Sequence, residues 1–192
     1  MTKIRAISHT GTCPDRKTDA FIREESRKRN LFRILMGILF VCYVGAVLYL
    51  VLIERIIHGN LSRFHGNIVQ MPYLTQVKAF IQPVPFRTIR HYMERLRQGS
   101  PLRRFAVMNL AGNLMLFMPM GIFLPYFRKK QRNPFRFTLT MIFMISCVEI
   151  AQLFTLLGAC DIDDLILNLT GALAGFLLFH IMNFLKKRGE NR

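Results

Sequence analysis

The sequence predicts an all-α, polytopic membrane protein with four transmembrane helices and interfacial helices in the segment 55–104. Two observations predict this class: 52% of the 192 residues are hydrophobic, and they form long continuous blocks rather than a periodic stripe. Because hydrocarbon offers the backbone no water, a block of about 20 apolar residues satisfies its N–H and C=O groups only as a spanning helix. We therefore expect spans at residues 31–53, 105–127, 135–157 and 163–185.

The chain has a strong positive charge, and its basic residues gather near the ends of these blocks. The net charge is +16, and many of the Lys and Arg residues stand close to the ends of the apolar blocks. At such positions they orient helices and attract anionic lipid headgroups. This placement predicts membrane lipids and anionic headgroups as partners, and it argues against nucleic acid as the partner.

The loops predict an orientation for the chain. The loop 128–134 holds four basic residues, whereas the loop 158–162 holds none and opens an acidic run. With a basic tail at 1–30, a membrane domain at 31–185 and a basic tail at 186–192, the positive-inside rule places both termini in the cytoplasm. The segment 55–104 then lies outside, although it carries nine Lys or Arg residues.

Two parts of that segment have the pattern of short interfacial helices. Apolar residues recur between charges in Glu54–Phe64 and again in Thr88–Leu96. Between them, Pro83 and Pro85 exclude a helix and favour an extended chain.

Polar residues inside the spans are the candidates for function, because hydrocarbon should exclude them. By the rise of a helix, those in the last three spans lie about 6 to 12 Å from the outer ends of their helices. Their spacings of three and four residues place them on single helix faces, which predicts a shared pocket open to the outer surface. The predicted pocket residues are Asn109, Asn113, Glu149, Gln152, Asp161, Asp164 and Asn168.

Four further residues have predicted structural roles. Gly171 and Gly175 continue the stripe of Asp161, Asp164 and Asn168, and they would let a neighbouring helix approach closely. In the second span, Pro119 and Gly121 predict a kink that widens the pocket.

Each pocket residue also has a structural interpretation. Buried amides such as Asn109, Asn113 and Gln152 often serve as packing contacts worth about 0.6 kcal/mol each. Glu149 favours function, because an ionised carboxylate at that depth costs a few kcal/mol unless it is partnered. Asp161 and Asp163 can be solvated loop acids, one of which caps the fourth span, and Asp164 is expected to face the site.

In combination and in order, these motifs resemble the VanZ-like family of bacterial membrane proteins over about residues 80–180. The resemblance implies a bacterial cell membrane and a link to low-level resistance against the lipoglycopeptide antibiotic teicoplanin. Many members carry an Arg shortly before the acidic run, where this chain has Gly158-Ala159-Cys160. The motifs are Pro85-Phe86-Arg87-Thr88-Ile89, Asn109-Leu110-Ala111-Gly112-Asn113, Leu116-Phe117-Met118-Pro119-Met120-Gly121, Glu149-x-x-Gln152, and Asp161-Ile162-Asp163-Asp164-Leu165-Ile166-Leu167-Asn168 with Gly171 and Gly175.

Three hypotheses about function follow. The first is a pocket that binds an amphiphile, either an envelope lipid or cell-envelope precursor, or a lipoglycopeptide. The second is an intramembrane enzyme or lipid transporter that uses Glu149 and Asp164 as an acid–base pair or as oxygen ligands for a cation. The third is helix-mediated assembly through the Gly171/Gly175 face.

The residues favour binding over catalysis. The pocket has no activated nucleophile and no histidine, and the histidine inside a span, His180, is near the opposite end of the fourth span. We therefore predict no catalytic residue and no cofactor, and the sequence leaves open whether a metal binds.

Overall fold

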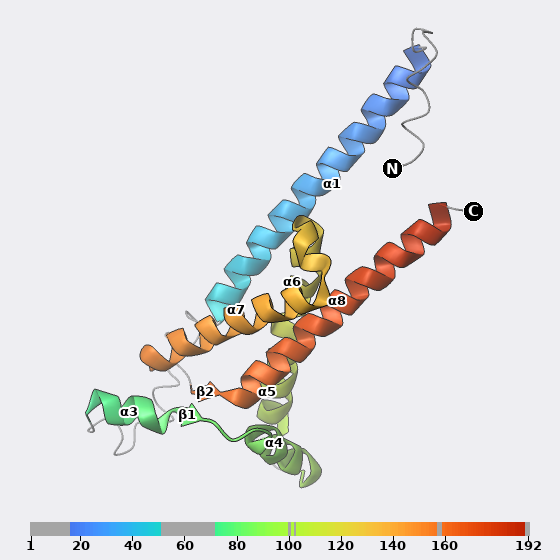
Figure 1. The fold of residues 1–192 in the computed structure, drawn as a ribbon. Coiled ribbons are helices and arrows are strands. Elements are labelled where there is room, and N and C mark those ends of the chain that lie inside the picture. Colours follow the sequence, from blue (N-terminus) through green and yellow to red (C-terminus); the bar gives the residue numbers. More distant parts are fainter. Residues whose placement is uncertain (1–15, 51–71, 100, 102, 157–158, 191–192) are drawn as a thin grey trace. The chain divides into compact units, whose positions relative to one another are not determined.

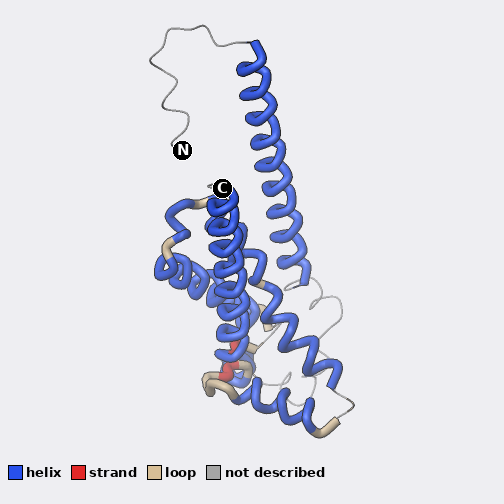
Figure 2. The backbone as a smooth tube through the Cα atoms, turned by 90° about the vertical axis from the view of Figure 1, so that its right-hand side faces the viewer, coloured by secondary structure: helices blue, strands red, loops and turns tan. Residues whose placement is uncertain are grey.

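A computed structural model describes residues 16–50, 72–99, 101, 103–156 and 159–190. Within these ranges, four helices are long and apolar enough to cross a membrane: Ala20–Leu48, Ala106–Phe127, Pro134–Phe154 and Ile162–Gly189. The predicted fold class, a helical protein with four candidate spans, is thus confirmed. Figure 2 shows how completely helices dominate the described chain.

The chain divides into two units, residues 1–42 and residues 43–192. Helix α1, Arg16–Leu48, begins fifteen residues before the predicted span, inside the segment predicted as a tail. Its polar first half carries the i,i+4 salt bridge between Lys28 and Glu24, at 2.8 Å. Such a pair supports a helix where no apolar face is buried.

The second unit holds the remaining elements (Figure 1). They are α3 (Tyr73–Ala79), β1 (Ile81–Gln82), α4 (Arg87–Arg97), α5 (Arg103–Leu116), α6 (Met118–Phe127), the 3₁₀ helix η5 (Lys129–Arg132), α7 (Pro134–Phe154), β2 (Cys160–Asp161) and α8 (Ile162–Glu190).

The helix of the second predicted span is interrupted at one residue, which divides it into α5 and α6. The helical geometry breaks at Phe117, and Pro119 lies in the first turn of α6. Proline is favoured there because its missing N–H would have no partner in the first turn anyway. The predicted bend at Pro119 therefore takes the form of a helix end and a new start. Across the break, the Tyr43 hydroxyl donates to the carbonyl of Leu116 at 2.8 Å.

Helices α5 and α6 pack directly against α8, backbone to backbone. A Cβ added to Gly171 would overlap the carbonyl oxygen of Leu114, and one added to Gly175 would overlap that of Met118. From the other side, a Cβ on Gly121 would overlap the backbone of Ala172. Because both contacts advance by four residues along each helix, α5–α6 and α8 run parallel.

Helix α7 runs antiparallel to α8. Near its beginning, Phe137 stacks on Phe176 of α8 with ring centroids 4.5 Å apart. At its end, Leu153 packs in a small apolar cluster with Val77 and Phe80, against Cys160 just before α8. The beginnings of α5 and α8 and the end of α7 therefore lie at the same end of the unit.

The segment before α5 lies at that same end (Figure 1). Strand β1 pairs in parallel with β2, with Ile81 opposite Cys160 and Gln82 opposite Asp161. The predicted interfacial helix at Thr88–Leu96 corresponds to α4, and the extended chain predicted around Pro83 begins with β1. Helix α3 was not predicted, and the helix predicted at Glu54–Phe64 falls outside the described residues.

Candidate functional site

Asp163 joins the start of α8 to the start of α4. Its side chain is fully buried. One carboxylate oxygen accepts the N–H of Phe86, and the other accepts those of Thr88 at 2.7 Å and Ile89 at 3.0 Å. These are backbone donors that a helix leaves without a partner at its N-terminus. The carboxylate thus caps α4 from a distant part of the chain, and it also complements the helix dipole.

Asp161 performs the matching task for α8. Its Oδ1 accepts the N–H of Asp163 at 2.9 Å, so Asp161 caps the helix that begins at Ile162. Its Oδ2 accepts the hydroxyl of Thr88 at 2.6 Å. The interpretation of Asp161 and Asp163 as solvated loop acids is wrong, because their exposed fractions are 7% and 0%. A cap supplied by one of them is present.

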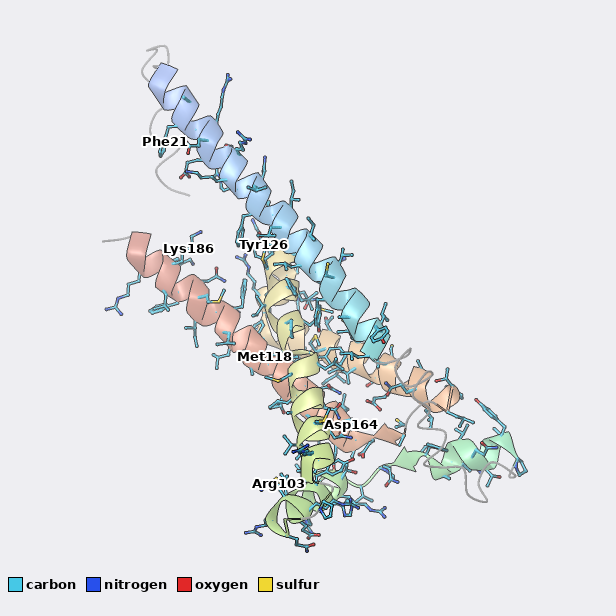
Figure 3. The ribbon with its side chains drawn as sticks, turned by 180° about the vertical axis from the view of Figure 1, so that it is seen from behind. Phe21, Arg103, Met118, Tyr126, Asp164 and Lys186 are labelled. Atoms are coloured by element: carbon cyan, nitrogen blue, oxygen red, sulfur yellow. The ribbon has the colours of Figure 1, made fainter. Side chains whose placement is uncertain are left out.

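A chain of polar side chains connects α4, α5 and α8. The Asn109 amide donates to the Tyr92 hydroxyl at 3.1 Å, and the Asn113 amide donates to Asn109 Oδ1 at 3.3 Å. Asn113 also donates to Asp164 Oδ1. Asp164 lies at the start of α8 beside α5 (Figure 3). Three of the predicted pocket residues thus contact one another across two helices.

The remaining predicted pocket residues are buried in α7 and α8. Glu149 and Gln152 of α7 and Asn168 of α8 are exposed by 6%, 4% and 3%. Asn168 Oδ1 accepts no hydrogen bond from the part of the chain that is described. Gly171 and Gly175 contact α5 and α6 of the same chain, so assembly through this face would require those helices to separate.

The thiol of Cys160 has a raised pKa. Burial raises the pKa of its thiol, and the charges of Glu149, Asp161 and Asp164 raise it further. These three acids come from α7, β2 and α8.

This arrangement predicts a pH profile for the alkylation of Cys160. In a variant with Cys13→Ser, Cys42→Ser and Cys147→Ser, N-ethylmaleimide should react with a midpoint above that of an ordinary cysteine, since the raised pKa lowers the thiolate fraction at any given pH. Adding Asp164→Asn should lower the midpoint, because one repelling charge is removed. An unchanged midpoint in that variant would show that Asp164 does not act on the thiol.

An open groove borders the polar chain on the side of α4. Its volume is about 1010 Å³, and its wall consists of the loop after β1, one face of α4, and Ala159 and Asp161. Among the described residues, no group of three His, Cys, Asp or Glu side chains could hold a metal ion. Of the predicted pocket residues, Asp161 lines this groove, whose wall also includes His91.

Sequence reasoning missed Thr88, Tyr92 and the role of Asp163. One signal was available for the last: Pro85-Phe86-Arg87 opens α4 without a Ser, Thr, Asp or Asn that could cap it. A helix start without its own cap leaves backbone N–H groups for an acceptor from elsewhere in the chain or for water. Phe86 itself has a left-handed backbone with φ of 62°, as its N–H turns toward Asp163.

Comparison with known proteins gives one result. The model of the VanZ/LLP1 family matches residues 40–183, a range that includes the polar chain, both capping aspartates and the groove. Comparisons with curated proteins and with solved structures found no match. Because the matched range covers well over half of the chain, this multi-pass membrane protein belongs to the VanZ/LLP1 family.

Proposed function

We propose that the chain binds an amphiphile at the end of the second unit where α5 and α8 begin, in the outer leaflet of a bacterial cell membrane. The amphiphile is either an envelope lipid or precursor, or a lipoglycopeptide antibiotic such as teicoplanin. In the second case, binding protects the cell from the antibiotic. The observation that carries the proposal is the groove of about 1010 Å³, whose wall includes Asp161 and two residues hydrogen-bonded to the polar side chains, Thr88 and Tyr92.

The distribution of charge supports an outward-facing groove. Helix α7 separates two unlike ends: η5 with Lys129, Lys130 and Arg132 precedes it, and the acidic β2–α8 junction follows it. The positive-inside rule favours cytoplasm at the η5 end. With α7 spanning the membrane, the groove then opens on the outer side, and both termini lie in the cytoplasm.

The composition of the groove supports an amphiphile rather than a wholly polar ligand. Val84 and Phe86 line it and are 52% and 57% exposed. They stand beside Thr88, Tyr92 and several charged side chains of α4. Ligand sites commonly combine apolar walls with a few placed polar groups in this way.

Glu149→Gln tests the proposal with little change of shape. If the buried acid contributes to the site, teicoplanin protection or lipid binding should fall by about tenfold, the loss expected for one charge-assisted hydrogen bond. The minimum inhibitory concentration in a bacterial host, normalised to the amount of protein in the membrane, measures protection. Glu25→Gln, an exposed residue of the first unit, is the control. Undiminished protection and lipid binding in Glu149→Gln would contradict the proposal.

The alternative function is an intramembrane enzyme or lipid transporter that uses the carboxylates of Glu149 and Asp164. Burial and the charges of Glu149, Asp161 and Asp164 raise the pKa of the Cys160 thiol, which makes it a poor nucleophile. Incubating the purified protein with lipids, with and without a chelator, separates the two functions. Product that forms with the parent protein and not with Asp164→Asn would establish catalysis in place of binding alone.

A further inference from the structure

Three arginines of α4 line the groove without being neutralised. Arg87, Arg90 and Arg95 form part of its wall. Arg87 donates to Gln82 Oε1 at 3.3 Å, and Arg95 Nε donates to His91 Nε2 at 2.8 Å. In the described part of the chain, none of the three makes a salt bridge. Each therefore keeps terminal N–H groups for a ligand.

The acids near these arginines do not cancel their charge. Asp161 lines the groove but is only 7% exposed, and its charge can offset at most one of the three guanidinium groups. Asp163 is buried beneath the start of α4. Glu94 is the other acid of the wall, against three guanidinium groups. The open face of the groove is therefore basic.

A bound anion would meet apolar surface beside this basic face. The exposed side chains of Val84 and Phe86 belong to the same wall. The capping bonds of Asp163 hold Phe86 at the first turn of α4, directly before Arg87. Helix α4 ends at Arg97, and the candidate span begins at Ala106. Only a few residues therefore separate α4 from the segment that enters the membrane. An inorganic anion would leave the apolar part of the wall unused.

We propose that this groove recognises a phosphate-bearing amphiphile, with Arg87 and Arg90 binding the phosphate and the Val84–Phe86 segment contacting the adjoining chains. The proposal rests on the proposed function and names its ligand class. A guanidinium group presents a planar pair of N–H donors that matches two phosphate oxygens. Arg95, which also bonds His91, extends the basic surface.

The test compares three probes on the purified full chain in a neutral detergent. They are dioctanoyl phosphatidic acid, dioctanoylglycerol, which has the same chains without phosphate, and inorganic phosphate. Native mass spectrometry measures the affinity of each. The double variant Arg87→Gln/Arg90→Gln should bind the phosphatidic acid about a hundredfold more weakly, at about tenfold for each lost charged contact. Arg97→Gln, on the same helix but outside the groove wall, should bind it as the parent does.

The outcomes separate this inference from the proposed function. Binding of dioctanoylglycerol as tight as that of phosphatidic acid would overturn phosphate recognition and leave amphiphile binding standing. Binding of inorganic phosphate as tight as that of phosphatidic acid would assign the groove to a free anion and overturn the lipid. If Arg97→Gln lost as much affinity for phosphatidic acid as the double variant, the loss would follow from the net charge of the protein. That result would also overturn the proposal. No binding of any probe by the parent would overturn both. Unchanged thermal unfolding of the double variant shows that any loss of binding is not misfolding.

Discussion

Replacing Asp163 with alanine is expected to release the start of α4 from α8 and to lower the free energy of unfolding by about 1 to 3 kcal/mol. Three partly buried backbone donors lose their acceptor, and water can replace it for those that become exposed. Thermal or denaturant unfolding of the purified protein measures the loss. Hydrogen exchange of the Phe86, Thr88 and Ile89 amides shows where it arises, since these protons should exchange much faster in the variant.

Two other substitutions give this prediction its controls. Asp163→Asn keeps the shape but removes the charge and one acceptor, so it should lose less stability than alanine does. Glu25→Gln, an exposed carboxylate in the first unit, should change neither stability nor exchange at α4. If Asp163→Ala leaves the three amides as protected as in the parent, the carboxylate does not cap α4 and its assigned role is wrong.

The three aspartates of the acidic run each bind a different part of the chain. Asp161 holds the start of α8 and Thr88, Asp163 holds the start of α4, and Asp164 accepts from Asn113 of α5. Successive residues of a helical first turn point in different directions, so neighbouring acids can serve different elements. One turn of α8 thereby fixes α4 and α5, which together with the loop after β1 determine the shape of the groove.

The four spans could be predicted from the sequence because their cause is local. A continuous apolar block, such as residues 135–157, must become a helix in hydrocarbon wherever its neighbours lie. The break at Phe117 was predictable only as a bend, since Pro119 removes an N–H wherever the helix restarts. Which side of the proline carries the break depends on packing against α8.

The candidate site could be predicted in part. The i,i+4 spacing of Asn109 and Asn113 placed both on one face, and Asn113 contacts both Asn109 and Asp164. The donors that meet Asp163 are 74 to 77 residues away in the chain, so no periodicity connects them. The β1–β2 pairing that brings them together covers two residues of each strand. Such a short strand has no recognisable alternation, because two residues cannot show a period.

Adding a single methyl group at the glycines of α8 is expected to separate the helices. Gly171→Ala and Gly175→Ala should each destabilise the protein by about 2 kcal/mol or more, because the new Cβ overlaps backbone carbonyls of Leu114 and Met118 that cannot rotate away. The helix propensity gained from alanine, about 1 kcal/mol, offsets only part of this cost. Unfolding with sodium dodecyl sulfate in mixed micelles, followed by circular dichroism, measures the change.

Gly112→Ala provides the matched control, because a Cβ at this position in α5 meets open space. It should leave the stability unchanged or raise it by up to about 1 kcal/mol, whereas the substitutions in α8 should lower it. The separation should also reach the polar chain, since Asp164 lies two turns before Gly171 in α8 and its partner Asn113 precedes Leu114 in α5. In the variant that keeps Cys160 alone, alkylation should then be faster with Gly171→Ala than with Gly112→Ala. Equal stability of the α8 variants and the Gly112 variant would show that α5–α6 and α8 do not approach as closely as their backbones indicate.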